Sequence, residues 1–283
     1  MPQNVSVSVL STGSVRIRPE HVESNGTHLY WWLLTSRRWT APRPINVYVI
    51  EHESGLVLFD TGQDRASVTD PGYFPRGPLR FFFRRLARFD IGVGDTLTAQ
   101  LASAGFDIAD VTTAVISHLH QDHIGGLREL SGARIVVSDA EWKTLSSPLA
   151  VADGLLARHI RLPGLRWQTV TPAPMSDAGI APFTDAVDLM GDRSLMLVPT
   201  PGHTPGSLSL IVRSVDGPPV ILVGDLTYDV GLLARLRVPG VGSKRRLRAT
   251  SALVNNFVAR NPGAIVLAAH DPAAAGLLAG VSA

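Results

Sequence analysis

The sequence predicts a layered α/β protein in which β-sheets lie inside and helices lie outside. Two hydrophobic stretches have the pattern of β-hairpins, and between them strand-like runs alternate with helix-like runs. Proline and glycine are scattered as turn residues, and no low-complexity linker divides the chain. We therefore expect residues 1–283 to form one domain, with residues 1–44 as an N-terminal extension whose role stays open.

The first hairpin is predicted at residues 45–59. Two β-rich runs, 45–50 and 56–59, flank a turn that contains Ser54 and Gly55. The second run leads directly into Asp60, followed by Thr61 and Gly62. Residues 64–95, which follow, have no clear periodicity, and we expect a lid or a pocket wall there.

Between the hairpins the predicted elements are, in chain order, a helix at 96–104, strands at 113–117 and 133–137, a helix near 140–145 and a strand at 195–198. Ser138 and Glu141 form a capping-box pattern that begins the second of these helices. Residues 146–185 again lack a period, so a long functional loop is expected there.

The second hairpin resembles the first. Runs 208–212 and 220–223 are joined by a turn at 216–219, and the second run ends in Gly224 and Asp225. Two hairpins that each end in an aspartate suggest a duplicated architecture. A helix is then predicted at 251–260 and a buried strand at 264–269.

Composition limits the classes of function. The 283 residues are 45% hydrophobic and 18% charged, which excludes a disordered chain. A net charge of +2 is too small to indicate nucleic acid or membrane as a partner, and the basic run 244–248 is expected to be a solvated loop. The absence of cysteine excludes disulfides, a cysteine nucleophile and thiolate metal ligands. With no signal-peptide or membrane-span pattern, we expect a cytoplasmic protein.

One segment carries most of the chemical information. His118, His120, Asp122 and His123 lie in the pattern His-x-His-x-Asp-His, directly after an apolar strand and before two glycines. His118 and His120 are two residues apart, so in extended backbone they point to the same face. Three imidazoles and a carboxylate are suitable ligands for zinc or another first-row divalent ion. The alternative interpretation is a solvated turn with a helix-capping aspartate.

Three further candidate ligands each follow a predicted strand. They are His203 in Pro-Gly-His-Thr-Pro-Gly, Asp225 and His270. Strand ends at one sheet edge can bring such side chains together from distant parts of a sequence. Together with the first motif, they complete a set of ligands for two metal ions.

This order of motifs resembles the metallo-β-lactamase fold superfamily over nearly the whole chain, from about Ile45 to His270. The resemblance implies an αββα four-layer sandwich with two mixed sheets flanked by helices. It also implies that His118, His120 and His203 hold a first metal, that Asp122, His123 and His270 hold a second, and that Asp225 bridges them. Asp60 would orient a ligand histidine. The metals would be zinc, with manganese, iron or cobalt as alternatives.

Within that superfamily, the sequence most resembles the N-acyl homoserine lactonases. Tyr228 lies three residues after Asp225, and Asp271 follows His270, as in that group. The resemblance implies a dinuclear hydrolase that opens a lactone ring by attack of a metal-bridging hydroxide. Tyr228 would donate a hydrogen bond to the developing oxyanion, and Asp122 would pass a proton to the leaving alkoxide.

Several points stay open from the sequence. The rival functions are an organophosphate or aryl-ester hydrolase of the methyl parathion hydrolase type, and a metal-binding module without turnover. The aromatic and basic residues of segment 72–90 would line an acyl groove, form an ordinary amphipathic helix or form a dimer surface. The partner is expected to be a small ester or lactone, and a homodimer is compatible with the sequence. His21, His28, His52 and His159 have no motif context.

Overall fold

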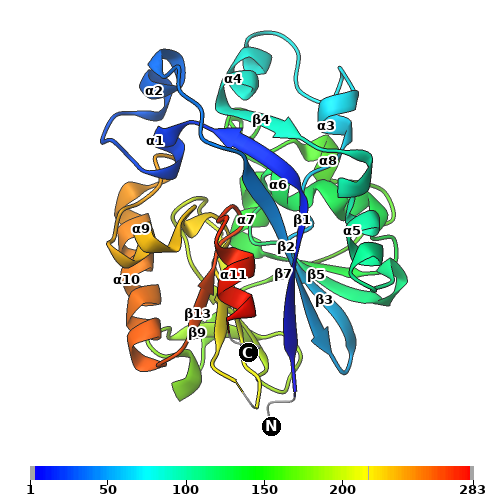
Figure 1. Cartoon of the computed structure of the whole chain (residues 1–283), viewed down its shortest axis with the longest axis vertical. Helices are drawn as coiled ribbons and strands as arrows, with labels where there is room; N and C mark the ends of the chain where they lie inside the picture. Colours follow the sequence, from blue (N-terminus) through cyan, green and yellow to red (C-terminus); the bar gives the residue numbers. More distant parts are fainter. Residues whose placement is uncertain (1–3, 216, 281–283) are drawn as a thin grey trace.

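The computed structural model describes residues 4–215 and 217–280. Within these residues the strands form two sheets, one in the order β4-β1-β2-β3-β5-β6-β7 and one in the order β13-β12-β11-β10-β9-β8. Helices α9 and α10 lie on one side of the sheets and α5, α6 and α8 on the other (Figure 1). This αββα arrangement confirms the predicted fold class.

The strands are β1 Ser6–Ile17, β2 Arg43–His52, β3 Gly55–Phe59, β4 Ala87–Asp90, β5 Val111–Val115, β6 Arg134–Ser138, β7 Arg166–Val170, β8 Ala173–Pro174, β9 Asp185–Asp188, β10 Leu195–Pro199, β11 Leu208–Val212, β12 Val220–Leu222 and β13 Ile265–Leu267. The helices are α1 Pro19–Val22, α2 Leu29–Thr35, α3 Ala66–Thr69, α4 Pro78–Leu86, α5 Leu97–Ser103, α6 Gln121–Ile124, α7 Asp139–Thr144, α8 Ala157–Ile160, α9 Val230–Ala234, α10 Lys244–Arg260 and α11 Ala274–Ala279. Both sheets are mixed, because β3, β5, β6 and β7 run parallel, as do β12 and β13, while other neighbours are antiparallel.

Alternation along β2 explains how the layers pack. Tyr48 and Ile50 belong to the core between the two sheets, whereas Val47 and Val49 belong to the core under the helices that cover the first sheet. Successive side chains of a strand point to opposite faces, so the uninterrupted apolar run of β2 is buried on both. The site-bearing loops therefore extend from a sheet that is covered on each side.

The outer face of the second sheet is covered by α10. Leu247, Val254 and Phe257 of this helix are fully buried in one cluster with Val198 and Ile221 of the sheet. Their spacing of seven and three residues places them on one helical face. Burying each such side chain contributes about 1.5–3 kcal/mol, which fixes α10 against the strands.

Both predicted hairpins form, one in each sheet. Strands β2 and β3 pair antiparallel, with Tyr48 opposite Phe59, and β11 pairs antiparallel with β12. Asp216, the first residue of the second predicted turn, lies outside the described residues. The strand predicted at 113–117 is β5, which begins at Val111 and ends at Val115.

The basic run 244–248 is helical, so the prediction of a loop was wrong. It forms the first turns of α10, which begins seven residues before the predicted helix. Ser243 caps the helix by accepting a hydrogen bond from the Arg246 backbone N–H, and Leu247 anchors the first turn in the core. Arg245 and Arg248 remain exposed, as expected for solvated charges.

Within the predicted N-terminal extension, residues Ser6–Ile17 form a strand of the first sheet, and residues 18–42 contain the short helices α1 and α2. Strand β1 lies between β2 and β4 and pairs with β2 from Ser6 to Val15. Segments 64–95 and 146–185, which lack a sequence period, contain only short elements, from two to nine residues long. Such elements are too short to produce a visible period. No helix in the described part of the chain is long and apolar enough to cross a membrane.

Candidate metal centre

The loop after β5 carries the first motif at the end of the sandwich opposite the two chain ends (Figure 1). His118 and His123 are buried, and His120 is the N-cap residue of the short helix α6, which contains Asp122 and His123. Gly125 follows α6 and lies against the loop after β3, where a Cβ atom would lie 2.0 Å from the Asp64 backbone nitrogen. Only glycine allows the two loops to approach this closely.

The other three candidate ligands come from the second sheet. His203 follows β10, Asp225 lies in a 3-10 turn after β12, and His270 follows β13. Gly224 has φ +54° and a Cβ there would lie 3.0 Å from Ser117, so this residue permits both the left-handed turn and the contact between the sheets. The loops that follow β10, β12 and β13 of the second sheet therefore meet the loop that follows β5 of the first sheet.

The structure brings all seven predicted ligand side chains together. Among the described residues, three groups have ligand atoms within 4.8 Å of one another: His118, His120 and His203; His118, His123 and Asp225; and Asp122, His123 and His270. His120 Nδ1 lies 3.0 Å from Nε2 of both His118 and His203. Asp225 lies between the groups, with Oδ2 3.5 Å from His203 Nε2 and Oδ1 3.5 Å from His270 Nε2.

Two buried atoms in this cluster lack hydrogen-bond partners. His123 Nε2 and Asp225 Oδ1 are enclosed and lie 3.5 Å apart, with no hydrogen bond to either among the described residues. Buried polar atoms are normally satisfied, so two orphaned ligand atoms that face each other fit a cation held between them. Imidazole and carboxylate donors are suited to zinc and similar divalent ions. The residues present therefore fit divalent metal ions.

The electrostatics favour a bound cation. Burial holds the pKa of His118 and of His203 well below the usual histidine value, so both are neutral imidazoles with a free lone pair. Burial also lowers the pKa of His123, but the carboxylates of Asp60 and Asp225 outweigh it and raise that pKa well above the usual value. The same two carboxylates that favour a proton on the His123 ring would also favour a metal cation bound to that ring instead of the proton.

Outer contacts set the orientation of four of the five imidazoles. His120 Nε2 donates to the Asp153 carbonyl at 2.9 Å, and His270 Nδ1 donates to the Pro44 carbonyl at 3.0 Å. Because a carbonyl oxygen only accepts, the neutral form of each ring carries its proton on this nitrogen and presents the lone pair of the opposite nitrogen to the cluster. His118 Nδ1 is 3.0 Å from the Ser117 hydroxyl. In the fifth ring, that of His203, Nδ1 faces away from the cluster and has no hydrogen-bond partner within the described chain.

Asp60 lies where the resemblance implied. Its Oδ2 accepts a hydrogen bond from His123 Nδ1 at 2.8 Å, and its carboxylate also accepts from the backbone N–H and the hydroxyl of Ser117, at 2.7 and 2.9 Å. Asp60 has φ 62°, an uncommon conformation for a residue with a side chain. Strained backbone of this kind persists where surrounding contacts hold it, and here it aims the carboxylate at the ligand.

Glu141 is a buried residue of the site that the sequence analysis did not assign. Its Oε1 accepts from the Leu119 backbone N–H and its Oε2 from the Gly206 backbone N–H, both at 3.1 Å. It therefore joins the loop of His118 and His120 to that of His203. The predicted capping box is half wrong, because Ser138 does cap α7 but the Glu141 side chain is used for this bridge. The only sequence signal for Glu141 was its position three residues after Ser138, which indicated a helix cap rather than a role in the site.

Tyr228 lies directly beside the candidate bridging residue. Its Oη donates a hydrogen bond to Asp225 Oδ2 at 2.6 Å, and its ring stacks on that of His270 at 5.5 Å between centroids. Burial and the Asp225 carboxylate raise the pKa of Tyr228 well above its usual value. The phenol therefore keeps its proton and acts as a hydrogen-bond donor.

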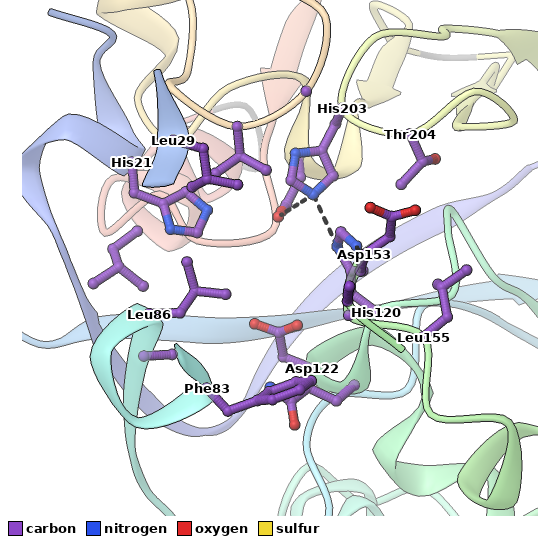
Figure 2. Close-up of a pocket in the computed structure, with 18 of the residues that line it drawn as sticks. His21, Leu29, Phe83, Leu86, His120, Asp122, Asp153, Leu155, His203 and Thr204 are labelled. Carbon is purple, nitrogen blue, oxygen red and sulfur yellow. Dashed lines mark hydrogen bonds and ion pairs between the residues drawn. The ribbon is translucent and has the colours of Figure 1, made fainter. Parts of the chain in front are cut away.

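The cluster opens into a cavity of about 630 Å³. One wall is polar and contains His120, Asp122, His203 and Tyr228, while the facing wall is apolar and is formed by Val15, Ile17, Leu29, Leu33, Leu79, Phe82, Phe83, Leu86 and Phe89. Figure 2 shows His120 and His203 on one side of the pocket and Leu29, Phe83 and Leu86 on the other, with Asp122 between them beside Phe83. Of the aromatic residues in segment 72–90, Phe82, Phe83 and Phe89 line the cavity, whereas Tyr73, Phe74 and Phe81 do not.

The fold and this site together define a metal-dependent hydrolase. The chain belongs to the Metallo-beta-lactamase superfamily, whose model matches residues 40–270. It is 30% identical to proteins named N-acyl homoserine lactonase AttM, from Azorhizobium caulinodans over 231 residues and from Agrobacterium fabrum over 230. Each match covers 81% of this chain and 82% of the relative.

Solved structures share the fold. An N-acyl homoserine lactone hydrolase with the product N-hexanoyl-L-homoserine bound at its catalytic metal centre has a TM-score of 0.74 and 20% identity, covering 96% of this chain and 95% of that one. A Bacillus thuringiensis AiiA variant with N-decanoyl-L-homoserine bound has a TM-score of 0.73, with the same identity and coverage. The predicted superfamily is thus confirmed.

Proposed function

We propose that this protein is a dinuclear, metal-dependent lactonase that opens the ring of N-acyl homoserine lactones. The observation that carries the proposal is the position of Tyr228, a protonated phenol 2.6 Å from Asp225 at the boundary between the ligand cluster and the cavity. The relatives named N-acyl homoserine lactonases support the substrate class.

Two of the three groupings of side chains support two metal positions. We assign His118, His120 and His203 to the first metal, and Asp122, His123 and His270 to the second. Asp225 would contact both, because its two oxygens face different groups. When bound, the ions would supply a water acidic enough to lose its proton near pH 7 and a Lewis acid for the lactone carbonyl.

Tyr228 and Asp122 would act on the substrate itself. The Tyr228 hydroxyl is held at the edge of the cluster and would donate its hydrogen bond to the carbonyl oxygen as negative charge develops there. Asp122 lines the cavity, and its Oδ2 lies 3.5 Å from His270 Nε2. This carboxylate would take a proton from the attacking water and pass it to the alkoxide oxygen that leaves when the ring opens.

The cavity matches the two parts of such a substrate. A homoserine lactone ring and its amide would occupy the polar wall, whereas the acyl chain would lie against the apolar wall formed by α2, α4 and β1. Leu33 and Phe83 are almost fully buried in the absence of a ligand, so this wall is preformed by packing. We therefore expect affinity to rise with acyl-chain length.

A substrate panel tests the proposal. Metal-loaded protein is assayed with N-hexanoyl and N-decanoyl homoserine lactones, a phosphotriester and an aryl ester under the same conditions. We expect the highest kcat/KM for the lactones, with a lower KM for the decanoyl compound. A higher kcat/KM for the phosphotriester or the aryl ester would favour the rival hydrolase, and no turnover of any substrate by fully loaded protein would favour a binding module.

A further inference from the structure

His21 is a buried histidine that the proposed chemistry does not yet use. It lies on α1, 207 residues before Tyr228 in sequence, and its Nε2 is 3.0 Å from the Tyr228 hydroxyl. The two rings meet edge to face at 5.1 Å between centroids. His21 lines the cavity, and Figure 2 shows its ring directed into the pocket. Its Nδ1 has no partner among the described residues.

The direction of the His21–Tyr228 hydrogen bond follows from counting protons. The Tyr228 hydroxyl has one proton, and the short contact of 2.6 Å to Asp225 Oδ2 uses it. His21 Nε2 must then donate to the phenol oxygen, which requires the neutral tautomer with its proton on Nε2. Burial lowers the pKa of His21 to about 4, so the ring is neutral near pH 7.

We propose that His21 is a positioning residue for Tyr228: the Nε2–H of His21 holds the phenol oxygen in place, so that the phenol proton points away from His21 and toward the ligand cluster. This inference rests on the proposed lactonase function. A hydrogen bond received by a hydroxyl oxygen polarises the O–H bond and strengthens the hydrogen bond that the hydroxyl donates. His21 therefore helps the Tyr228 hydroxyl to stabilise an oxyanion by acting through the phenol oxygen rather than on the oxyanion itself.

The backbone around His21 is held independently of its side chain. The His21 carbonyl accepts from the Gly240 N–H at 3.1 Å, and the Val238 carbonyl accepts from the Ser24 N–H at 2.8 Å. Trp32, at 6.1 Å between ring centroids, packs beside the imidazole. We therefore expect an aromatic or amide replacement at position 21 to leave α1 in place.

Two replacements separate positioning from simple packing. His21→Phe keeps a ring but removes the donor, and we expect kcat/KM for a lactone to fall about 5- to 20-fold, mainly through kcat. His21→Gln carries an amide N–H at about the distance of Nε2 from the backbone, so it should recover most of this loss. Metal content should be unchanged in both. Equal losses in the Phe and Gln variants, or loss of metal, would overturn the proposal.

A double-mutant cycle tests whether His21 acts through Tyr228. In a Tyr228→Phe background, His21→Phe should change kcat/KM by less than about 2-fold, because the group that it positions is already absent. Additive losses would overturn the proposal. His159→Phe is the matched control, since that imidazole also stacks on a tyrosine, Tyr73, at 4.1 Å but lies outside the cavity lining. It should leave kcat/KM unchanged.

Nitrogen NMR of the histidine rings gives a readout that does not depend on turnover. Long-range proton–nitrogen spectra of the loaded protein should show His21 with its proton on Nε2, and Tyr228→Phe should shift that nitrogen. A proton on Nδ1 instead would overturn the proposal. If the wild-type protein opens no lactone while His21 keeps this tautomer, the proposed function fails but the His21–Tyr228 hydrogen bond stands, so the two failures are distinguishable.

Discussion

His123 Nδ1 donates a hydrogen bond to Asp60 Oδ2 at 2.8 Å, and both side chains are almost fully buried. The contact joins the turn after the first hairpin to a candidate ligand 63 residues later. When a metal is bound, this contact would keep the His123 proton on Nδ1 and leave Nε2 free to act as a ligand. A carboxylate in this position also makes the ring a stronger electron donor.

Asp60→Asn should therefore weaken metal binding. Loss of such an outer carboxylate lowers metal affinity by about 10- to 100-fold, and competition with a chelator of known affinity measures the change. Asp192→Asn is the matched control, because Asp192 also pairs with a histidine, His52, at 3.2 Å but lies outside the cluster. Equal affinity in wild-type protein and the Asp60→Asn variant would contradict the assigned role.

Asp225→Ala should lower both metal content and activity. The substitution removes the side chain proposed to contact both metals, and it takes away the carboxylate that faces His203 and His270 at 3.5 Å. Elemental analysis of protein loaded and desalted in parallel with wild type measures the loss. Full turnover by this variant would show that Asp225 does not bridge.

Tyr228→Phe should lower kcat/KM without affecting the metals. Removing one oxyanion donor reduces rate by about 10²–10³, and a weaker, water-replaceable contact by about 10-fold. Metal content and Tm should stay close to wild type, because the phenol contacts Asp225 rather than an ion. Unaltered lactone kinetics would make Tyr228 a packing residue, and loss of metal would place it among the groups that support the ligands.

The sequence predicted those features that depend on local pattern. The hairpins at β2–β3 and β11–β12 follow from β-rich runs and turn residues, and the ligand candidates follow from residue types that are rare in this spacing. Because each candidate directly follows a strand, the sheet topology brings the candidates together.

Features that depend on long-range contacts were not predictable from one sequence. His21 and Glu141 are linked to the site by partners 207 and 65 residues away, and neither lies in a metal-binding motif. The start of α10 was missed because its first turn is mostly basic, and only the packing of Leu247 against the sheet identifies it as helix. The local sequence pattern therefore indicated the candidate ligands, but not the residues that contact and orient the loops and side chains around them.

Glu141→Ala should destabilise the protein. It leaves two buried N–H groups without acceptors, each at a cost of about 1–3 kcal/mol in the free energy of unfolding. Glu141→Gln keeps one acceptor and should lose less. Glu129→Gln is the control, because this carboxylate is only half-buried and the two hydrogen bonds that it accepts are exposed to solvent. Chemical denaturation measures all three, and an unchanged midpoint for Glu141→Ala would contradict the bridging role.

The buried, neutral His21 should make metal-free protein less stable in acid. Its pKa is lowered to about 4 by burial, so between pH 6.5 and 4 the unfolded chain takes up a proton that the folded chain does not. Stability from this group is present above pH 6.5 and falls as pH falls. Between pH 7 and 5 the loss is about 2 kcal/mol, and His21→Phe should lack it. Denaturant titrations at both pH values measure the difference, and equal losses in the two proteins would contradict it.

A zinc titration of metal-free protein, with opening of an N-acyl homoserine lactone as the readout, tests the dinuclear lactonase most directly. Aliquots are withdrawn at each step, and bound metal and initial rate are measured on the same sample. We predict that turnover stays low through the first equivalent and saturates at two equivalents per chain. Saturation at one equivalent, or no lactone opening with both equivalents bound, would contradict it.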